Sequence, residues 1–221
     1  MGSDSALRVH DLLWIREDAE LLSPDEPAWI QNALEQAAVV VVRRAEAPPR
    51  FISIGIRGYS RARRHAAFLR RSDVLACRTP ESLASEKTWR KVSTAISPGL
   101  RTALKIVTGF SEREHLVWGP IGSVGYQLAT GMQATSDTSD LDLLVRCGDF
   151  PNRALLHAFH DAIRSCVVRV DVILEGPQGA VALEEYLQNR NVLIKTNRGP
   201  RLGTFPGQGS EDQANARINW I

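Results

Sequence analysis

Apolar and polar residues divide the first third of the chain into short strands and one helix. The β-branched run at 38–42 and the roughly alternating run at 51–56 predict two neighbouring strands, because branched side chains favour an extended backbone. The other elements expected before residue 79 are a strand or turn at 10–15, a helix at 27–37, a helix or loop near 68–69 and a strand at 74–77.

The remainder of the chain alternates helices with strands. Thr79 followed by Pro80 predicts a helix start with Thr79 as the N-cap, and Gly131 predicts a helix end. The expected helices are 84–95, 99–110, 124–130, 151–164 and 179–188, and the expected strands are 115–118, 141–146 and 167–174. Residues 192–195 are expected to form a final strand or the edge of a helix.

These elements predict an α+β protein of two domains. Residues 1–78 are expected to form a smaller α/β domain with an arginine-rich segment. Residues 79–203 are expected to form the catalytic domain, a mixed sheet with helices. Residues 204–221, rich in Gly, Gln and Asn, are predicted to be a mobile tail.

The composition is that of an ordinary folded protein, with 43% hydrophobic and 24% charged residues. No apolar run approaches the ~20 residues that span a bilayer, and the N-terminus does not resemble a signal peptide. Cys77, Cys147 and Cys166 are too widely spaced for a metal or disulfide motif. We therefore expect a cytoplasmic protein with free thiols and no membrane partner.

Two segments carry most of the chemistry. Residues 118–127 read Trp-Gly-Pro-Ile-Gly-Ser-Val-Gly-Tyr-Gln, and residues 139–144 read Ser-Asp-Leu-Asp-Leu-Leu. The Gly-Ser pair predicts a turn that opens a helix, where free backbone N–H groups bind anions. Asp140 and Asp142 fall on one face of the following strand. Two carboxylates beside a phosphate site suit Mg²⁺, so the pattern predicts phosphoryl or nucleotidyl transfer.

A third acid, Asp171, lies in an apolar strand between Val170 and Val172. A buried charge without a partner is unfavourable by several kcal/mol. Either a metal or an arginine, such as Arg169 or Arg146, must therefore compensate it. In the first case Asp171 joins the two aspartates above as a metal ligand.

Basic residues concentrate between residues 43 and 71, where nine arginines stand against one acid, although the net charge of the chain is only +2. Such a run is most often a solvated face, but arginine forks also match phosphate oxygens in a small-molecule site. Few aromatic residues are interleaved, so we expect no nucleic-acid partner. The alternative from another class is a non-catalytic RNA-binding module, which predicts salt-sensitive RNA binding without Mg²⁺.

Taken together, the motifs resemble the malonate decarboxylase holo-acyl-carrier-protein synthase family, the phosphoribosyl-dephospho-CoA transferases. The resemblance covers roughly residues 8–203. Besides the two segments quoted above, it rests on Arg61, Arg64 and residues 10–14, 27–29, 41–44, 54–58, 170–172, 175–179, 193–196 and 199–200.

The resemblance implies a nucleotidyltransferase fold and a defined reaction. Enzymes of this family transfer the phosphoribosyl-dephospho-CoA group of 2′-(5″-triphosphoribosyl)-3′-dephospho-CoA to a serine of the acyl-carrier subunit of malonate decarboxylase, and they release pyrophosphate. The runner-up is another magnesium-dependent nucleotidyltransferase, acting on a small molecule, a tRNA or a protein.

The resemblance also assigns residues. The two-aspartate motif of the family falls on Asp140 and Asp142, which are expected to be catalytic and to hold Mg²⁺. Asp171 is the third catalytic and metal-binding residue by analogy of fold. From the residues themselves, the N–H groups around Gly122 and Ser123 are expected to bind the leaving phosphates, and Lys195 or arginines of the 57–64 run, with Arg57 and Arg61 among them, are expected to balance the remaining charge.

Overall fold

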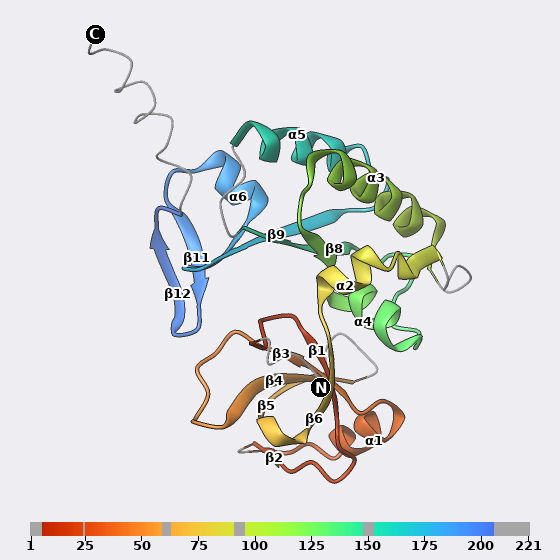
Figure 1. Ribbon diagram of the computed structural model, residues 1–221, viewed down its shortest axis with the longest axis vertical. Coiled ribbons are helices and arrows are strands. Elements are labelled where there is room, and N and C mark those ends of the chain that lie inside the picture. The colour runs from red at the N-terminus through yellow and green to blue at the C-terminus, as the bar shows by residue number, and fades with distance from the viewer. Residues whose placement is uncertain (1–5, 24, 59–62, 91–95, 148–152, 206–221) are drawn as a thin grey trace.

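The computed structural model describes residues 6–23, 25–58, 63–90, 96–147 and 153–205. Within this part, twelve strands form two six-stranded sheets and six α-helices pack around them, which confirms the α+β class (Figure 1). All strands of the first sheet lie before residue 79, and all strands of the second lie after residue 117. Among the described helices, none has the length and apolar character needed to cross a bilayer.

The N-terminal sheet is antiparallel throughout. Its strand order is β2-β5-β4-β3-β1-β6. The strands are β1 (Leu12–Ile15), β2 (Leu21–Leu22), β3 (Val39–Val42), β4 (Phe51–Arg57), β5 (Arg64–Arg70) and β6 (Val74–Arg78). Helix α1 (Trp29–Gln36) buries Ile30 with Ile52, Ile54 and Ile56 in a core on one face of this sheet. Because strand residues alternate, Gly55 and Arg57 belong to the other face.

The C-terminal sheet is mixed, as the sequence predicts, with order β12-β11-β10-β9-β8-β7. Its strands are β7 (Trp118–Pro120), β8 (Leu141–Arg146), β9 (Val170–Gly176), β10 (Gly179–Ala182), β11 (Val192–Thr196) and β12 (Gly199–Gly203). Among the strand pairs of the described residues in this sheet, only β8 and β9 are parallel.

Helices lie on both sides of the C-terminal sheet. Helices α3 (Pro98–Glu114), α5 (Arg153–Arg164) and α6 (Leu183–Gln188) cover the face away from the N-terminal sheet (Figure 1). Helices α2 (Pro80–Ser85) and α4 (Gly122–Thr130) lie on the side that faces it. Leu141, Leu143 and Val145 of β8 point into the core beneath the first group. Alternation therefore turns Asp142 and Arg146 toward the N-terminal domain.

Several predicted elements are confirmed at their boundaries. The strand at 141–146 matches β8 residue for residue. Thr79 caps α2, since its side chain accepts the Ser82 N–H at 3.1 Å. Gly131 ends α4 in the left-handed conformation, with φ 74°.

Other element assignments are wrong. Residues 68–69 belong to strand β5, because Phe68 and Leu69 pair with β4 in mid-sheet. The helix expected at 179–188 begins only at Leu183, since residues 179–182 form a hairpin with β9.

The helix and strand at the two ends of α3 also need correction. Of the helix expected at 84–95, only the first two residues lie in α2; a short 3₁₀ helix, Thr88–Arg90, follows, and residues 91–95 lie outside the described part. The strand expected at 115–118 starts at its last residue, because His115 ends α3 with φ 55°. A second 3₁₀ helix spans Arg71–Asp73, and strands β2 and β12 were not predicted.

The folded C-terminal domain extends at least through Phe205, two residues into the segment predicted as a tail. Phe205 is fully buried and packs edge-on against Tyr186 of α6, with ring centroids 6.1 Å apart. Residues 206–221 of the predicted tail lie outside the described part.

Candidate active site

The Gly-Ser turn and the aspartate strand are joined by backbone contact. The Ile121 N–H donates to the carbonyl of Asp142 at 2.9 Å, directly before α4 begins. Gly122 has φ +62°, and a Cβ added there would lie 2.1 Å from Oδ2 of Asp142. Only glycine allows this approach. The carboxylate of Asp142 therefore lies against the first turn of α4, where backbone N–H groups and the helix dipole favour negative charge.

The three predicted aspartates lie on neighbouring strands but not in equivalent surroundings. Asp140 immediately precedes β8, and Asp142 pairs in register with Asp171 of the parallel strand β9. Asp171 accepts a hydrogen bond from Arg169 at 2.9 Å, and its side chain is 42% exposed. The expectation that Asp171 is buried is therefore wrong, and Arg169 supplies the ion pair considered as its alternative role.

The residues fit a magnesium ion that takes much of its coordination from a substrate. Among the described residues, no group of three or more His, Cys, Asp or Glu is close enough to hold a metal by itself. Protein-bound Mg²⁺ commonly uses one or two carboxylates together with substrate phosphates and water. Asp140 and Asp142 meet that requirement, and the metal-binding role of all three aspartates stays a prediction.

The loop that leads to Asp140 is held by a buried glutamine. Gln127 of α4 is fully buried, and its Oε1 accepts the N–H groups of Ala134 and Thr135, both at 2.9 Å, and the hydroxyl of Thr135 at 2.8 Å. One side chain thereby fixes the loop onto the helix that carries the Gly-Ser turn. The position of Asp140 relative to that turn depends on this contact.

A cavity of about 380 Å³ lies between the two domains. Its volume is in the range of small-molecule sites, which span roughly 300–1,000 Å³. The C-terminal wall includes Gly122 and Tyr126, and the N-terminal wall consists of strands β3, β4 and β5 with their arginines. The lining residues are His10, Leu12, Val41, Arg43, Gly55, Ile56, Arg57, Arg64, His65, Ala66, Pro80, Leu83, Pro120, Ile121, Gly122, Gly125 and Tyr126.

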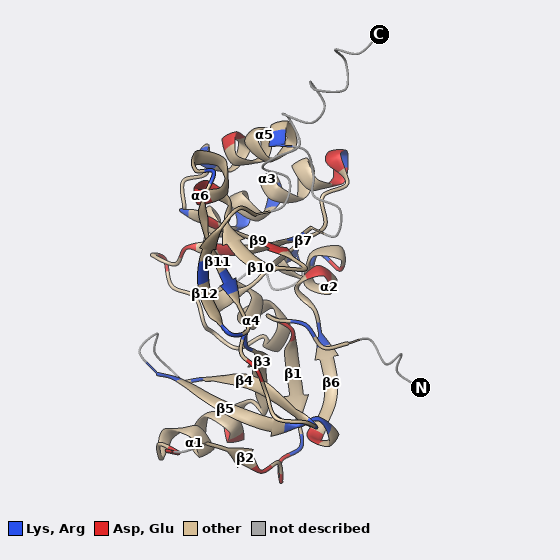
Figure 2. Ribbon diagram, turned by 90° about the vertical axis from the view of Figure 1, so that its left-hand side faces the viewer, with Lys and Arg blue, Asp and Glu red and all other residues tan. Residues whose placement is uncertain are grey.

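The charged side chains of this lining are three arginines; two histidines lie beside them, and no acid is among the described residues that form it. In Figure 2, Lys and Arg also stand out at the ends of β4 and β5 and along β11 and β12. A cavity with cationic walls favours a ligand that carries phosphates.

The predicted substrate-binding residues are distributed unevenly around the cavity. Gly122 and Arg57 line it, whereas Ser123 is buried in the first turn of α4. Lys195 is an exposed residue of β11 outside the lining. Arg61 lies outside the described residues.

Arg57 connects the two domains across the cavity. Its guanidinium lies over the ring of Tyr126, 5.7 Å from the centroid, and donates to the carbonyl of Ala134 at 3.0 Å. Burial raises the pKa of Tyr126, and the charge of Arg57 opposes this effect. The phenol is therefore neutral near pH 7, and it presents a polar ring to the cavity.

His10 lies at the cavity with an unusual backbone, φ 74°. Burial lowers the pKa of its imidazole to about 4, and the charges of Arg44, Arg146 and Lys195 act in the same direction. His10 is therefore neutral at pH 7. The same effect shows that Lys195, although outside the lining, contributes positive charge near it.

Ion pairs also fix the two domains to each other. Arg146 of β8 donates to Glu81 at 2.5 Å and to the carbonyl of Val9 at 3.0 Å, and lies 3.4 Å from Asp11. Burial raises the pKa of Asp11, whereas its hydrogen bond from the Arg8 N–H and the charge of Arg146 lower it.

A second ion pair, between Arg44 and Glu175, joins the end of β3 to β9, with both side chains at least 85% buried. Contacts at two separate points, around Arg146 and at the Arg44–Glu175 pair, therefore fix the position of the two cavity walls relative to each other.

Sequence reasoning missed several residues of this site. Arg43 and Arg64 were noted as members of a basic run and of the family motifs, and Tyr126 and Gln127 as members of a motif, but none of the four was assigned to the site. These residues come together through strand pairing and loop contacts between distant parts of the chain, so no local sequence pattern indicates that they share a site. The signal available in the sequence was the cluster of arginines between residues 43 and 71, in and around the strands expected at 38–42 and 51–56.

Comparison with known proteins assigns both domains. The model of the phosphoribosyl-dephospho-CoA transferase MdcG N-terminal domain matches residues 8–80, and the model of the corresponding C-terminal domain matches residues 82–206. The chain belongs to the phosphoribosyl-dephospho-CoA transferase family. The resemblance inferred from the motifs is thereby confirmed, and the protein is a transferase.

Curated relatives match this transferase over nearly its full length. A phosphoribosyl-dephospho-CoA transferase of Pseudomonas putida is 40% identical over 205 residues, which are 91% of this chain and 96% of the relative. One from Klebsiella pneumoniae strain 342 is 33% identical, covering 94% and 99%. One from Azotobacter vinelandii is 35% identical, covering 87% and 91%. No solved structure matches the transferase at a significant level.

Proposed function

We propose that this protein transfers the phosphoribosyl-dephospho-CoA group of 2′-(5″-triphosphoribosyl)-3′-dephospho-CoA to a serine of the acyl-carrier subunit of malonate decarboxylase. The observation that carries the proposal is the cavity between the domains. There a glycine turn that holds a carboxylate against a helix N-terminus faces a wall with three arginines. A substrate with several phosphates matches both walls, and family membership supports this substrate class.

The chain supplies binding and orientation for this reaction. Backbone N–H groups in the first turn of α4, at Gly122 and Ser123, bind the oxygens of the triphosphate. Arg57, whose guanidinium lies against Tyr126 of the same helix, balances part of the remaining negative charge. The incoming nucleophile belongs to the carrier protein, so the transferase needs none of its own.

The bond changes are those of a nucleotidyl transfer. The serine oxygen of the carrier bonds to the phosphorus nearest the ribose, and the bond from that phosphorus to the next phosphate breaks. Pyrophosphate leaves, and the serine proton is released to solvent. Asp140 and Asp142, with Asp171 beside them, would hold Mg²⁺, which would supply Lewis-acid stabilisation of the phosphate charge.

A transfer assay with intact-mass detection tests the proposal. Purified protein, Mg²⁺, the triphosphoribosyl-dephospho-CoA and the apo carrier subunit are mixed, and the carrier is weighed over time. The carrier is expected to gain the mass of the prosthetic group. Asp140→Asn and Asp142→Asn are expected to abolish the gain. The matched control is Asp137→Asn, an exposed loop carboxylate three residues before Asp140.

The outcomes separate the possible readings. Full transfer by both Asn variants would show that the two aspartates are not the reacting centre. No mass gain with the wild-type protein, under conditions in which a relative is active, would overturn the substrate assignment. A screen of nucleoside triphosphates for pyrophosphate release would then test the wider nucleotidyltransferase alternative.

A further inference from the structure

The N-terminal wall of the cavity has the features of a separate anion site. Arg57 and Arg64 are direct cross-strand partners on β4 and β5, and Gly55 and Ala66 are the next pair on the same face. Arg43 follows β3, beside Gly55. Three guanidinium-bearing residues therefore border a floor of two small residues.

Two of these arginines are available to a ligand. In the described part of the chain, Arg57 is anchored to Tyr126 and to the loop at Ala134, whereas neither Arg43 nor Arg64 is paired with a carboxylate. Arg57 and Arg64 lie opposite each other on neighbouring strands, so their positive charges repel. An anion bound beside them would remove this repulsion.

The position of the Arg43 side chain depends on the small residue beneath it, Gly55. A Cβ added at Gly55 would lie 3.0 Å from Cδ of Arg43 and 3.2 Å from Cγ1 of Val41, so even alanine would crowd this wall. Ala66 lies opposite in register and adds only a methyl group. The missing Cβ of Gly55 therefore makes room for the Arg43 side chain, which packs over this position on the face that carries Arg57 and Arg64.

This wall lies across the cavity from the Gly-Ser turn. The phosphate that reacts must lie near Gly122 and the carboxylate of Asp142, at the C-terminal wall. A ligand with a second anionic group, apart from its reacting phosphate, could place that group at Arg43 and Arg64 while the reacting phosphate lies at Gly122. The proposed substrate carries such a group, because its dephospho-CoA part contains a diphosphate between adenosine and pantetheine.

We infer that Arg43 and Arg64 bind the diphosphate of the dephospho-CoA part, whereas the first turn of α4 binds the triphosphate. The N-terminal domain then selects a substrate with two separated phosphate groups over a simple nucleoside triphosphate. This inference rests on the proposed function for the identity of the substrate.

Direct binding tests the inference without any transfer step. 3′-Dephospho-CoA, which has the diphosphate but no triphosphate, and inorganic tripolyphosphate are titrated separately by calorimetry. Arg43→Gln and Arg64→Gln are each expected to weaken dephospho-CoA binding about tenfold or more, the usual effect of losing a charge-assisted hydrogen bond. Tripolyphosphate binding should change less than about threefold, because long-range charge alone is screened by salt.

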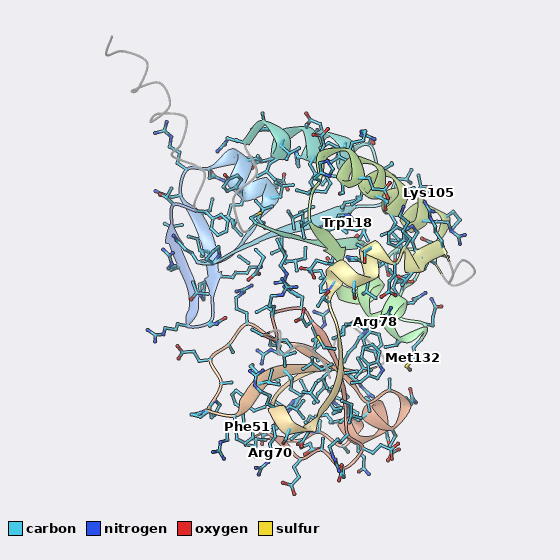
Figure 3. All side chains as sticks on the ribbon, in the orientation of Figure 1. Phe51, Arg70, Arg78, Lys105, Trp118 and Met132 are labelled. Carbon is cyan, nitrogen blue, oxygen red and sulfur yellow. The ribbon has the colours of Figure 1, made fainter. Side chains whose placement is uncertain are left out.

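A matched control is available on the same strand. Arg70 ends β5 and lies over the ring of Phe51, 5.6 Å from its centroid, at the far side of the N-terminal domain (Figure 3). Arg70→Gln removes the same charge from the same strand and should leave both affinities unchanged. Thermal unfolding of each variant shows whether it is folded.

Three results would overturn the inference. They are undetectable binding of dephospho-CoA to the wild type, an equal loss with Arg70→Gln, and a larger loss for tripolyphosphate than for dephospho-CoA in the two variants. Arg64→Lys adds a further readout, since it keeps the charge but loses the fork and should restore only part of the affinity. If the wild-type protein binds dephospho-CoA but does not modify the carrier in the transfer assay, the result would instead count against the proposed function alone.

Discussion

Replacing Gly122 by alanine tests the contact that holds Asp142 at the helix N-terminus. The new Cβ would lie 2.1 Å from Oδ2 of Asp142, and Cβ contacts below 3.0 Å are essentially never seen. The carboxylate must therefore move by about 1 Å, and a displacement of that size at a reacting centre lowers rates about 100-fold. The left-handed backbone adds strain of about 1–2 kcal/mol.

Gly131→Ala is the matched control for this prediction. Gly131 also has a positive φ, 74°, at the other end of the same helix, but no atom of the described residues lies within 4 Å of its added Cβ. It should lose about 1–2 kcal/mol of unfolding free energy and keep near-normal transfer. Urea unfolding and initial rates of carrier modification measure both effects. Equal stability losses, with transfer by Gly122→Ala within about threefold of wild type, would refute the clash argument.

Three further predictions concern the loop, pH and the metal. Gln127→Leu leaves three donors unsatisfied and should lower the urea-derived unfolding free energy by about 3 kcal/mol. Thr135→Val removes only one of these donors and should lower it by less. Equal losses in the two variants would contradict the hydrogen-bond network. The pKa of His10 is about 4 in the folded state against 6.5 unfolded, so the unfolded chain binds the proton first as pH falls. Stability should therefore drop between about pH 6.5 and 4, by an amount on the order of 3 kcal/mol. Urea titrations at pH 7 and pH 5 should show a smaller drop for His10→Asn, which tolerates the positive φ; the same drop in both proteins would exclude His10 as its source. Arg169→Gln frees the Asp171 carboxylate and should lower the Mg²⁺ concentration for half-maximal transfer, whereas Asp171→Asn should raise it; no shift in either would remove Asp171 from the metal site.

The order of elements around the predicted site and the backbone of its turns could be predicted because short segments encode them, whereas the roles of the site residues stay a prediction. The structure has the expected order of elements: strand β7, helix α4 opening at the Gly-Ser turn, aspartate strand β8, helix α5 and second aspartate strand β9. Turn residues, caps and alternation act over a few positions, so Gly122, Asp142 and Gly131 were assigned from sequence. The resemblance to the family draws on the same segments.

What the sequence did not reveal depends on contacts between distant residues. Strand β5 pairs along its length with β4, although its own pattern was ambiguous between helix and loop. The exposure of Asp171 and its pairing with Arg169 follow from its place at the start of β9, which an apolar run alone does not show. The cavity exists only because two sheets face each other, and no segment of either domain predicts it.

The order of the strands also limits how another protein can associate with the C-terminal sheet. Its two edges are β7 and β12, and each contains a proline, Pro120 and Pro200. Proline has no N–H to donate and is accommodated in sheets where its nitrogen faces away from the neighbouring strand. Both edges therefore resist extension by an added strand, which also protects the protein from aggregation through its edges. A carrier protein that docks on this sheet would therefore be recognised by side chains rather than by backbone pairing, so charge reversal on its surface should alter that recognition more than changes in its strand-forming tendency.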